Sequence, residues 1–247
     1  MRRRLRSGLT ATLDYTWAKA LDDDSQIGAQ GHVATTEATA SPSDTANRQP
    51  AAAIIAQDWL DLPGERGLST FDQRNLLKAS FQYTTGMGLG GETLLSGWRG
   101  RFFKEWTVMT QITAGSGLPE NPIVLAGVPG TGYTNIIRPD PTGAPLYTAP
   151  AGYYLNPAAF TAPPAGQWGT ARRNSITGPD QISLDSALAR TFRVRTKWNL
   201  DTRFEATNVL NHAAWTAWNT TVDNTLFGLP AAANPMRSLQ FVGRLRF

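Results

Sequence analysis

A period-two alternation of apolar and polar side chains is the feature that most constrains the fold of this chain. Side chains of a β-strand point alternately to opposite faces of a sheet, so the alternation predicts strands with one apolar and one polar face. The clearest segment is 197–207. Its polar positions are Lys197, Asn199, Asp201, Arg203, Glu205 and Thr207, and its largely apolar positions are Trp198, Leu200, Thr202, Phe204 and Ala206.

Five further segments show the same alternation, near residues 9–17, 77–83, 105–114, 182–188 and 239–247. Each predicted strand is about ten residues long, the length that crosses a bilayer when the strand is tilted by about 45°. No apolar run in the sequence approaches the ~18 residues of a membrane-spanning helix. We therefore expect an all-β chain, namely a segment of a transmembrane antiparallel up-and-down β-barrel with about six strands.

The connections between the predicted strands alternate between long and short. They cover residues 18–72, 84–104, 115–181, 193–196 and 208–237, and the first, third and fifth are the long ones. Outer-membrane barrels have long extracellular loops and short periplasmic turns, whereas compact soluble domains rarely contain several loops longer than about 15 residues. We expect the strands near 9, 105 and 197 to run outward, and the loops to be irregular because they are rich in Gly, Pro, Thr and Ala.

With this orientation, aromatic side chains gather where the strands meet the periplasmic interface. They are Tyr83, Trp106, Phe192, Trp198 and Phe247, and all lie on the apolar face of their strand. Tyr15 and Trp17 are expected at the opposite interface. We predict that this girdle, together with Leu200 and Phe204, faces lipid, and that Lys197, Asn199, Asp201, Arg203 and Glu205 face the lumen. Lumen walls of large barrels are polar in any case, so the polar set is not by itself a substrate path.

Other chemistries find little support in the sequence. The net charge of +4 is spread along strand-like segments without a nucleic-acid-binding motif, and there is no cysteine and only two histidines. The glycine pattern at 86–91 is followed by no helical pattern that could hold a pyrophosphate. Asp22, Asp23, Asp24 and Asp44 fit no recognised calcium loop. We expect no enzyme activity, no catalytic residues, no cofactor, no metal and no nucleic-acid partner.

Six phrases, in order along the chain, resemble the barrel of Oar-like TonB-dependent receptors. They are LDYTWAKALDD at 13–23, ERGLSTFDQR at 65–74, AGSGLP at 114–119, NPAAF at 156–160, WGTARRN at 168–174 with Gly178 and Pro179, and FEATNVLNH at 204–212. Thr207 and Leu210 occupy positions that are aromatic in the family's phrase. Each phrase alone is weak, but six phrases in the family's order, spread across nearly the whole chain, are specific.

This resemblance implies that residues 1–247 are one domain, the last strands of a barrel of about 22, located in the cell outer membrane. The implied function is that of a receptor or transporter barrel for uptake of an unidentified ligand. The implied partners are outer-membrane lipid, the barrel assembly machinery, which would recognise the terminal Phe247, and the TonB complex, which would act through an N-terminal part. We expect no plug and no signal peptide within these residues.

Two expectations follow for the fold. A partial barrel should be an open sheet with unpaired edges near 9–17 and 239–247. The alternative to a barrel is a secreted soluble all-β module for carbohydrate binding or adhesion, in which the apolar faces would form the core of a sandwich.

Overall fold

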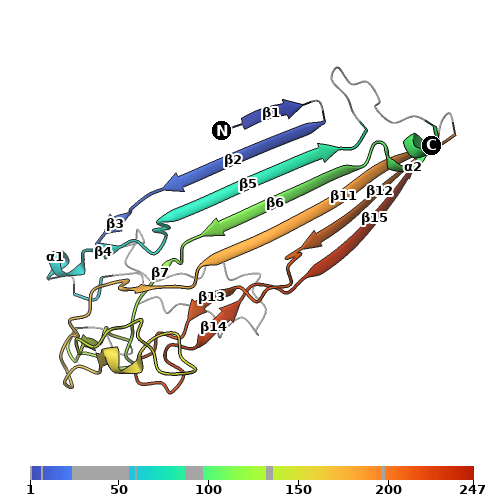
Figure 1. Cartoon of the computed structure of the whole chain (residues 1–247). Coiled ribbons are helices and arrows are strands. Elements are labelled where there is room, and N and C mark those ends of the chain that lie inside the picture. Colours follow the sequence, from blue (N-terminus) through green and yellow to red (C-terminus); the bar gives the residue numbers. More distant parts are fainter. Residues whose placement is uncertain are drawn as a thin grey trace.

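Seven antiparallel strands form one large sheet in the computed structural model, which describes residues 2–6, 8–23, 56–58, 60–86, 97–131, 136–195 and 198–247. The strands are β1 (Arg2–Arg6), β2 (Leu9–Trp17), β5 (Asn75–Thr84), β6 (Thr107–Gly115), β11 (Gln181–Arg195), β12 (Trp198–Thr207) and β15 (Ser238–Arg246). Each pairs with the next strand of this series along the chain, which is up-and-down topology (Figure 1). The six predicted strands and the all-β fold class are confirmed.

The prediction of β2 as an edge strand is wrong, because β1 pairs with its outer side. Residues 2–6 read Arg-Arg-Arg-Leu-Arg and carry no apolar alternation, so the sequence pattern could not identify this strand. Backbone hydrogen bonds require no such alternation. The sheet is nevertheless open as expected: β1 and β15 lie at its two edges and do not pair with each other.

The register places the apolar faces of the strands on one side of the sheet. Residues paired across neighbouring strands share a face, and Tyr83, Val108, Leu188, Phe204 and Phe241 form one continuous row across five strands. The polar row beside it contains Gln82, Met109, Ala187, Glu205 and Gln240. Both faces therefore extend across these five strands as the alternation predicts.

The apolar face of the large sheet is exposed. Its large exposed side chains include Leu13, Tyr15, Trp17, Phe81, Tyr83, Val108, Ile182, Trp198, Phe204, Leu239, Phe241 and Leu245. A soluble sandwich would bury such a face against a second sheet, but the other sheets in the described part of the chain are two-stranded. This arrangement does not fit the soluble alternative.

Among the described residues, no helix is both long enough and apolar enough to cross a membrane.

The described parts of the three long connections lie at one end of the sheet, and α2, from a short connection, lies at the other (Figure 1), which agrees with the predicted alternation. One boundary is wrong. The connection was expected at 193–196, but β11 continues to Arg195 and so includes three of those residues. The alternation in fact continues through this segment, since Val194 stands between Arg193 and Arg195.

The described parts of the long loops contain more regular structure than their composition suggests. They contain β3 (Leu21–Asp22), α1 (Leu62–Glu65), β4 (Gly67–Leu68), β7 (Pro119–Glu120), β8 (Asp140–Pro141), the 3-10 helix η5 (Pro157–Ala159), β9 (Phe160–Thr161), β10 (Ile176–Thr177), β13 (Trp215–Trp218) and β14 (Pro230–Ala233). The short strands pair as β3 with β4, β7 with β10, β8 with β9 and β13 with β14. We call the described parts of 18–74, 116–180 and 208–237 the loop cluster.

The buried apolar core of the chain lies in the loop cluster rather than in the large sheet. Of the buried apolar residues described, only Ala79 belongs to the sheet. One core group contains Val124, Val128 and Ile137, and a second contains Leu155, Ile176 and Phe227; Val222, from the third long loop, packs against both. The loops expected to be irregular therefore contain short regular elements and a core that their composition did not indicate.

The short-turn end carries a helix that the sequence does not predict. We expected no helix after the glycine pattern, but α2 spans Gly97–Phe103. The sequence did not predict this helix because Gly97 and Gly100 lower its helix propensity. Gly97, with φ of 65°, stands at its first position. Of the glycine pattern itself, only Gly86 lies among the described residues.

The face assignment predicts that Phe204→Arg is strongly destabilising. Phe204 lies midway along β12 and its ring centroid is 4.6 Å from that of Phe241. An arginine at a lipid-facing midplane position costs roughly 2–4 kcal/mol, which urea unfolding of a complete barrel that contains this segment, in lipid vesicles, would measure. The matched control is Arg203→Leu, one residue away on the polar face, for which we expect a loss of at most about 1 kcal/mol. Equal losses for the two variants would contradict the face assignment.

Candidate functional site

The polar face of the sheet forms a shallow groove with a volume of about 500 Å³. Its lining comes from five strands, β2, β5, β6, β11 and β12. The polar residues in this lining include Thr10, Thr12, Ser80, Gln82, Gln111, Asp185, Arg203, Glu205 and Thr207. A second groove of about 550 Å³ lies nearer the short-turn end and includes Glu105, Arg193, Asp201, Arg203 and Arg244. Both grooves are lined by polar and charged side chains that could contact a solute in water.

The lumen candidates on β12 lie on this polar face. Arg203 lines both grooves, Glu205 the first and Asp201 the second. Asn199 is paired in register with Arg246 on β15, at the short-turn end of the strand. Lys197 lies outside the described residues. The structure therefore places Asn199, Asp201, Arg203 and Glu205 together on one face, and their exposure to a lumen stays a prediction.

The charges on this wall are paired with one another. Arg203 forms an ion pair with Glu205. Asp201 accepts hydrogen bonds from the Thr191 hydroxyl at 2.7 Å and from the Arg246 guanidinium at 2.9 Å. Such pairs on a solvated wall contribute little stability. These contacts place cationic and anionic side chains side by side on the wall of the grooves.

The predicted girdle residues are on the opposite face, near the short-turn end. Trp106 packs edge-on against Phe192 with ring centroids 6.0 Å apart, and Trp198 lies 6.1 Å from Phe247. Tyr83 shares a row with Phe204, and Leu200 is paired with Phe192. Tyr15 and Trp17 lie at the other end of their strand, toward the loop cluster. The positions agree with the girdle pattern, and their contact with lipid stays a prediction.

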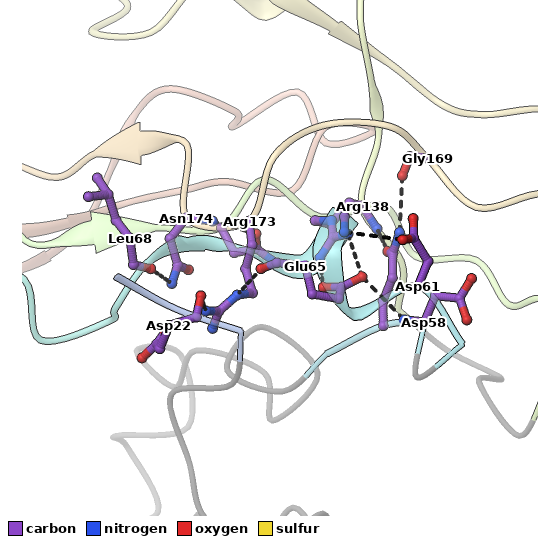
Figure 2. A network of polar contacts seen from close by, with 12 residues as sticks. Asp22, Asp58, Asp61, Glu65, Leu68, Arg138, Gly169, Arg173 and Asn174 are labelled. Atoms are coloured by element: carbon purple, nitrogen blue, oxygen red, sulfur yellow. Dashed lines mark hydrogen bonds and ion pairs between the residues drawn. The ribbon is translucent and has the colours of Figure 1, made fainter. Parts of the chain in front are cut away.

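At the loop end, a buried ion pair links the first long loop to the second. The Arg138 guanidinium donates two hydrogen bonds to the Glu65 carboxylate, at 2.5 and 2.7 Å (Figure 2). Both side chains are almost completely buried. Glu65 is held by α1 and also accepts from the backbone N–H of Asp58 at 3.2 Å. The two-pronged geometry satisfies both carboxylate oxygens, which burial of a charge requires.

A second buried arginine joins the same two loops beside this pair (Figure 2). Arg173 donates from Nε to the Glu65 carbonyl at 3.0 Å and forms an ion pair with Asp22. Its neighbour Asn174 donates to the Leu68 carbonyl at 2.6 Å. Residues 22, 65 and 68 come from the first loop and residues 173 and 174 from the second. The loops are thus bound to each other by the buried side chains of Arg173 and Asn174, with Asp22 partly exposed at the edge.

Close backbone approach at two glycines also holds the second long loop together. A Cβ atom at Gly117 would overlap the Gly178 carbonyl oxygen, and one at Gly169 would overlap the Arg138 carbonyl oxygen. Gly169 also accepts a hydrogen bond at 3.0 Å from Gln57, whose side-chain oxygen in turn accepts from the Arg138 backbone. Only glycine fits at positions 117 and 169 without displacement of the facing backbone.

Glu120, on β7 in the second long loop, attaches the third long loop to the second. The Glu120 carboxylate accepts hydrogen bonds from the backbone N–H of Trp218 at 3.1 and 3.2 Å. Burial of this carboxyl raises its pKa to about 7, although the hydrogen bond from Trp218 acts in the opposite direction. An isolated β-bridge between Ile123 and Thr221 lies nearby. Glu120 therefore couples the second and third loops near neutral pH.

Sequence reasoning did not identify these loop residues as a group. Glu65, Arg173 and Asn174 stand in phrases that resemble the receptor family, and that was the available signal. The partners are distant in sequence: 73 residues separate Glu65 from Arg138. No periodic pattern relates such positions, so alternation could not have paired them.

The structure describes only some of the candidate calcium ligands. Asp22 is engaged by Arg173, while Asp24 and Asp44 fall outside the described residues. Within the described ranges, no group of three or more His, Cys, Asp or Glu side chains is arranged to hold a metal ion.

Arg138→Met should open the loop cluster, because it leaves the Glu65 charge buried without its partner. Removal of one member of a buried pair costs roughly 3–5 kcal/mol. Protease cleavage within residues 56–74 and 136–180 would report the opening, since both segments are protected only while the loops pack. The matched control is the double variant Glu65→Leu with Arg138→Met, which removes both charges and should be cut more slowly. Unchanged cleavage in Arg138→Met would show that the pair does not hold the loops.

The raised pKa of Glu120 predicts that the loop cluster weakens as pH rises. Because the folded-state pKa is above the ordinary value of 4.5, the stabilisation is fully present below that value and is lost as pH rises through about 7. The expected loss is about 3 kcal/mol. Hydrogen exchange of β7 and β13 between about pH 5 and about pH 8, corrected for intrinsic exchange rates, would measure it. Glu120→Gln keeps an acceptor oxygen and should remove this dependence; a variant as pH-sensitive as the parent would exclude Glu120 as its source.

Comparison with known proteins agrees with this architecture. The family described as an outer membrane beta barrel domain matches residues 1–240. A search of curated proteins and a search of solved structures each found no match. The exposed apolar face, the polar opposite face and the segregation of long loops from short turns are the features of such a domain. The chain belongs to the outer membrane beta barrel domain family and is an outer-membrane protein.

Proposed function

We propose that this chain is part of the barrel of a TonB-dependent receptor, and that its polar face lines the path by which a solute is taken up across the outer membrane. The observation that carries the proposal is the shallow arc of the large sheet. Seven strands would nearly close a barrel of eight. Here β1 and β15 lie at opposite edges of a gently curved sheet (Figure 1).

A shallow arc implies a wide barrel that requires many further strands. Barrel diameter grows with strand number, and wide barrels enclose a channel or a plug rather than a packed core. The polar wall supports this, because its side chains are hydrated groove residues such as Gln82, Gln111 and Glu205, not a filled interior. These strands therefore suit the wall of a receptor barrel better than a small autonomous pore.

The loop cluster supports a receptor over a simple pore. It packs the three long loops around two apolar groups and the Glu65–Arg138 pair, which gives a defined surface at the extracellular end. Ordered loops lose less conformational entropy when they bind a ligand than mobile loops do. The family phrases at 65–74 and 168–174 meet in this cluster through Arg173, which bonds to the Glu65 carbonyl. Coupling to the TonB complex would act through a part outside these residues.

The proposal predicts that residues 1–247 alone do not form a stable pore. The unpaired edges of β1 and β15 cannot be hydrogen-bonded by lipid. Planar-bilayer recording of the refolded chain in potassium chloride should show no steady single-channel steps. Uniform steps that persist would contradict the proposal and would indicate a small closed barrel, with direct pairing between the two edge strands.

The gene itself provides the direct test of receptor identity. An in-frame reading upstream of Met1 should encode further barrel strands, a plug domain and a segment for contact with TonB. A stop codon shortly before Met1, with no such segment, would contradict the receptor proposal while leaving the barrel fold intact.

A further inference from the structure

The helix α2 at the short-turn end presents aromatic side chains to the surroundings. Trp98, Phe102 and Phe103 are 67%, 61% and 58% exposed, respectively. Trp98 and Phe102 are four residues apart, so they lie on one side of the helix. Arg99 places its guanidinium 5.5 Å from the Trp98 ring. A short helix with this much exposed aromatic surface needs an apolar neighbour.

The helix is attached rigidly to the sheet through its last carbonyl groups. The Phe102 carbonyl accepts hydrogen bonds from the Arg190 guanidinium at 2.6 Å and from the Trp106 indole N–H at 2.8 Å. The Phe103 carbonyl accepts from the Thr85 hydroxyl at 2.5 Å. These are carbonyls that a helix end leaves without intrahelical partners, and a cation is favourable there. The exposed aromatics are therefore held in place.

Arg190 connects α2 to the aromatic girdle. In register it belongs to the apolar face, between Leu188 and Phe192 on β11. Its guanidinium lies 4.5 Å from the Phe192 ring and 5.4 Å from the Trp106 ring, and the residue is only 9% exposed. Cation–π contacts and the Phe102 carbonyl replace water around this charge. The surface of α2 is thus continuous with the girdle of the membrane-facing wall.

The charges around α2 favour an anionic surface. Arg99 and Lys104 are basic, and the acidic residue that follows, Glu105, faces Arg193 at 3.8 Å. Basic side chains beside exposed aromatic rings are the composition of helices that lie in the headgroup region of a bilayer. The position at the short-turn end places α2 at the periplasmic leaflet.

We propose that α2 is an interfacial anchor that binds the phospholipid headgroups of the periplasmic leaflet. Trp98, Phe102 and Phe103 insert at the boundary between headgroups and acyl chains. Arg99 and Lys104 contact the lipid phosphates. The anchor sets the depth of the barrel wall in the membrane, because Arg190 and Trp106 join the helix to the girdle. This inference rests on the outer-membrane location and does not depend on the receptor proposal.

A nitroxide label on α2 tests the insertion. The chain has no cysteine, so Phe102→Cys gives one labelling site and keeps the carbonyl that Arg190 and Trp106 use. In phosphatidylcholine vesicles that contain phosphatidylglycerol, the label should be more accessible to oxygen than to a water-soluble nickel complex. Leu125→Cys, in the loop cluster and 67% exposed, is the control and should show the reverse. If the labels at both positions were more accessible to the nickel complex than to oxygen, as they are in water, the proposal would be overturned. A protein partner would then be the occupant of this surface.

The role of the charges is tested by retention of lipid. The double variant Arg99→Gln with Lys104→Gln should retain less phosphatidylglycerol in native mass spectrometry, by roughly five-fold for each charge removed. Arg172→Gln with Arg237→Gln removes two exposed charges from the loop cluster and should change retention little. Unchanged far-UV circular dichroism would confirm that both variants fold. Equal retention by the parent and the α2 variant, or an equal loss in the control, would contradict lipid binding through these charges.

Discussion

Backbone hydrogen bonding between neighbouring strands is the interaction on which the rest of this structure depends. Inside a bilayer no water is available for N–H and C=O groups, so the strands must satisfy one another. Their pairing in chain order sets the register, and the register places every apolar face on one side of the sheet. An exposed row such as Tyr83, Val108, Phe204 and Phe241 would be a liability in water. In a membrane it is the stabilised arrangement.

The same constraint explains why the apolar core lies outside the sheet. A wide barrel wall buries its apolar face in lipid and hydrates its polar face, so it needs no internal core. The loops are in water and must find their own stabilisation. They do so with two small apolar groups and with Arg138 and Arg173, whose charges are matched by Glu65 and Asp22. Glu120 is the member of this cluster whose contribution changes near neutral pH.

The sequence predicted the parts of the fold that have a period. Alternation identified six strands and both faces, because each is a local consequence of side-chain direction in a strand. The loop asymmetry followed from the lengths of the connections between those strands. It missed β1, which consists mainly of arginines, and α2, which is interrupted by glycines. It also missed the contacts of Glu65 and Glu120, because pairing across a folded loop leaves no trace in spacing. The role of Arg190 was missed for another reason, because a cation on an apolar face breaks the alternation. Only the structure shows that Trp106 and Phe192 lie against its guanidinium.

The central claim is that β12 separates water from lipid, with its polar residues toward the lumen. Single cysteines at positions 203, 204, 205 and 206, placed in the membrane-inserted protein, would be treated with a polar maleimide reagent. The account predicts labelling at 203 and 205, where Arg203 and Glu205 line the groove, and protection at 204 and 206. Labelling that does not alternate, or labelling at 204 and 206 alone, would contradict it.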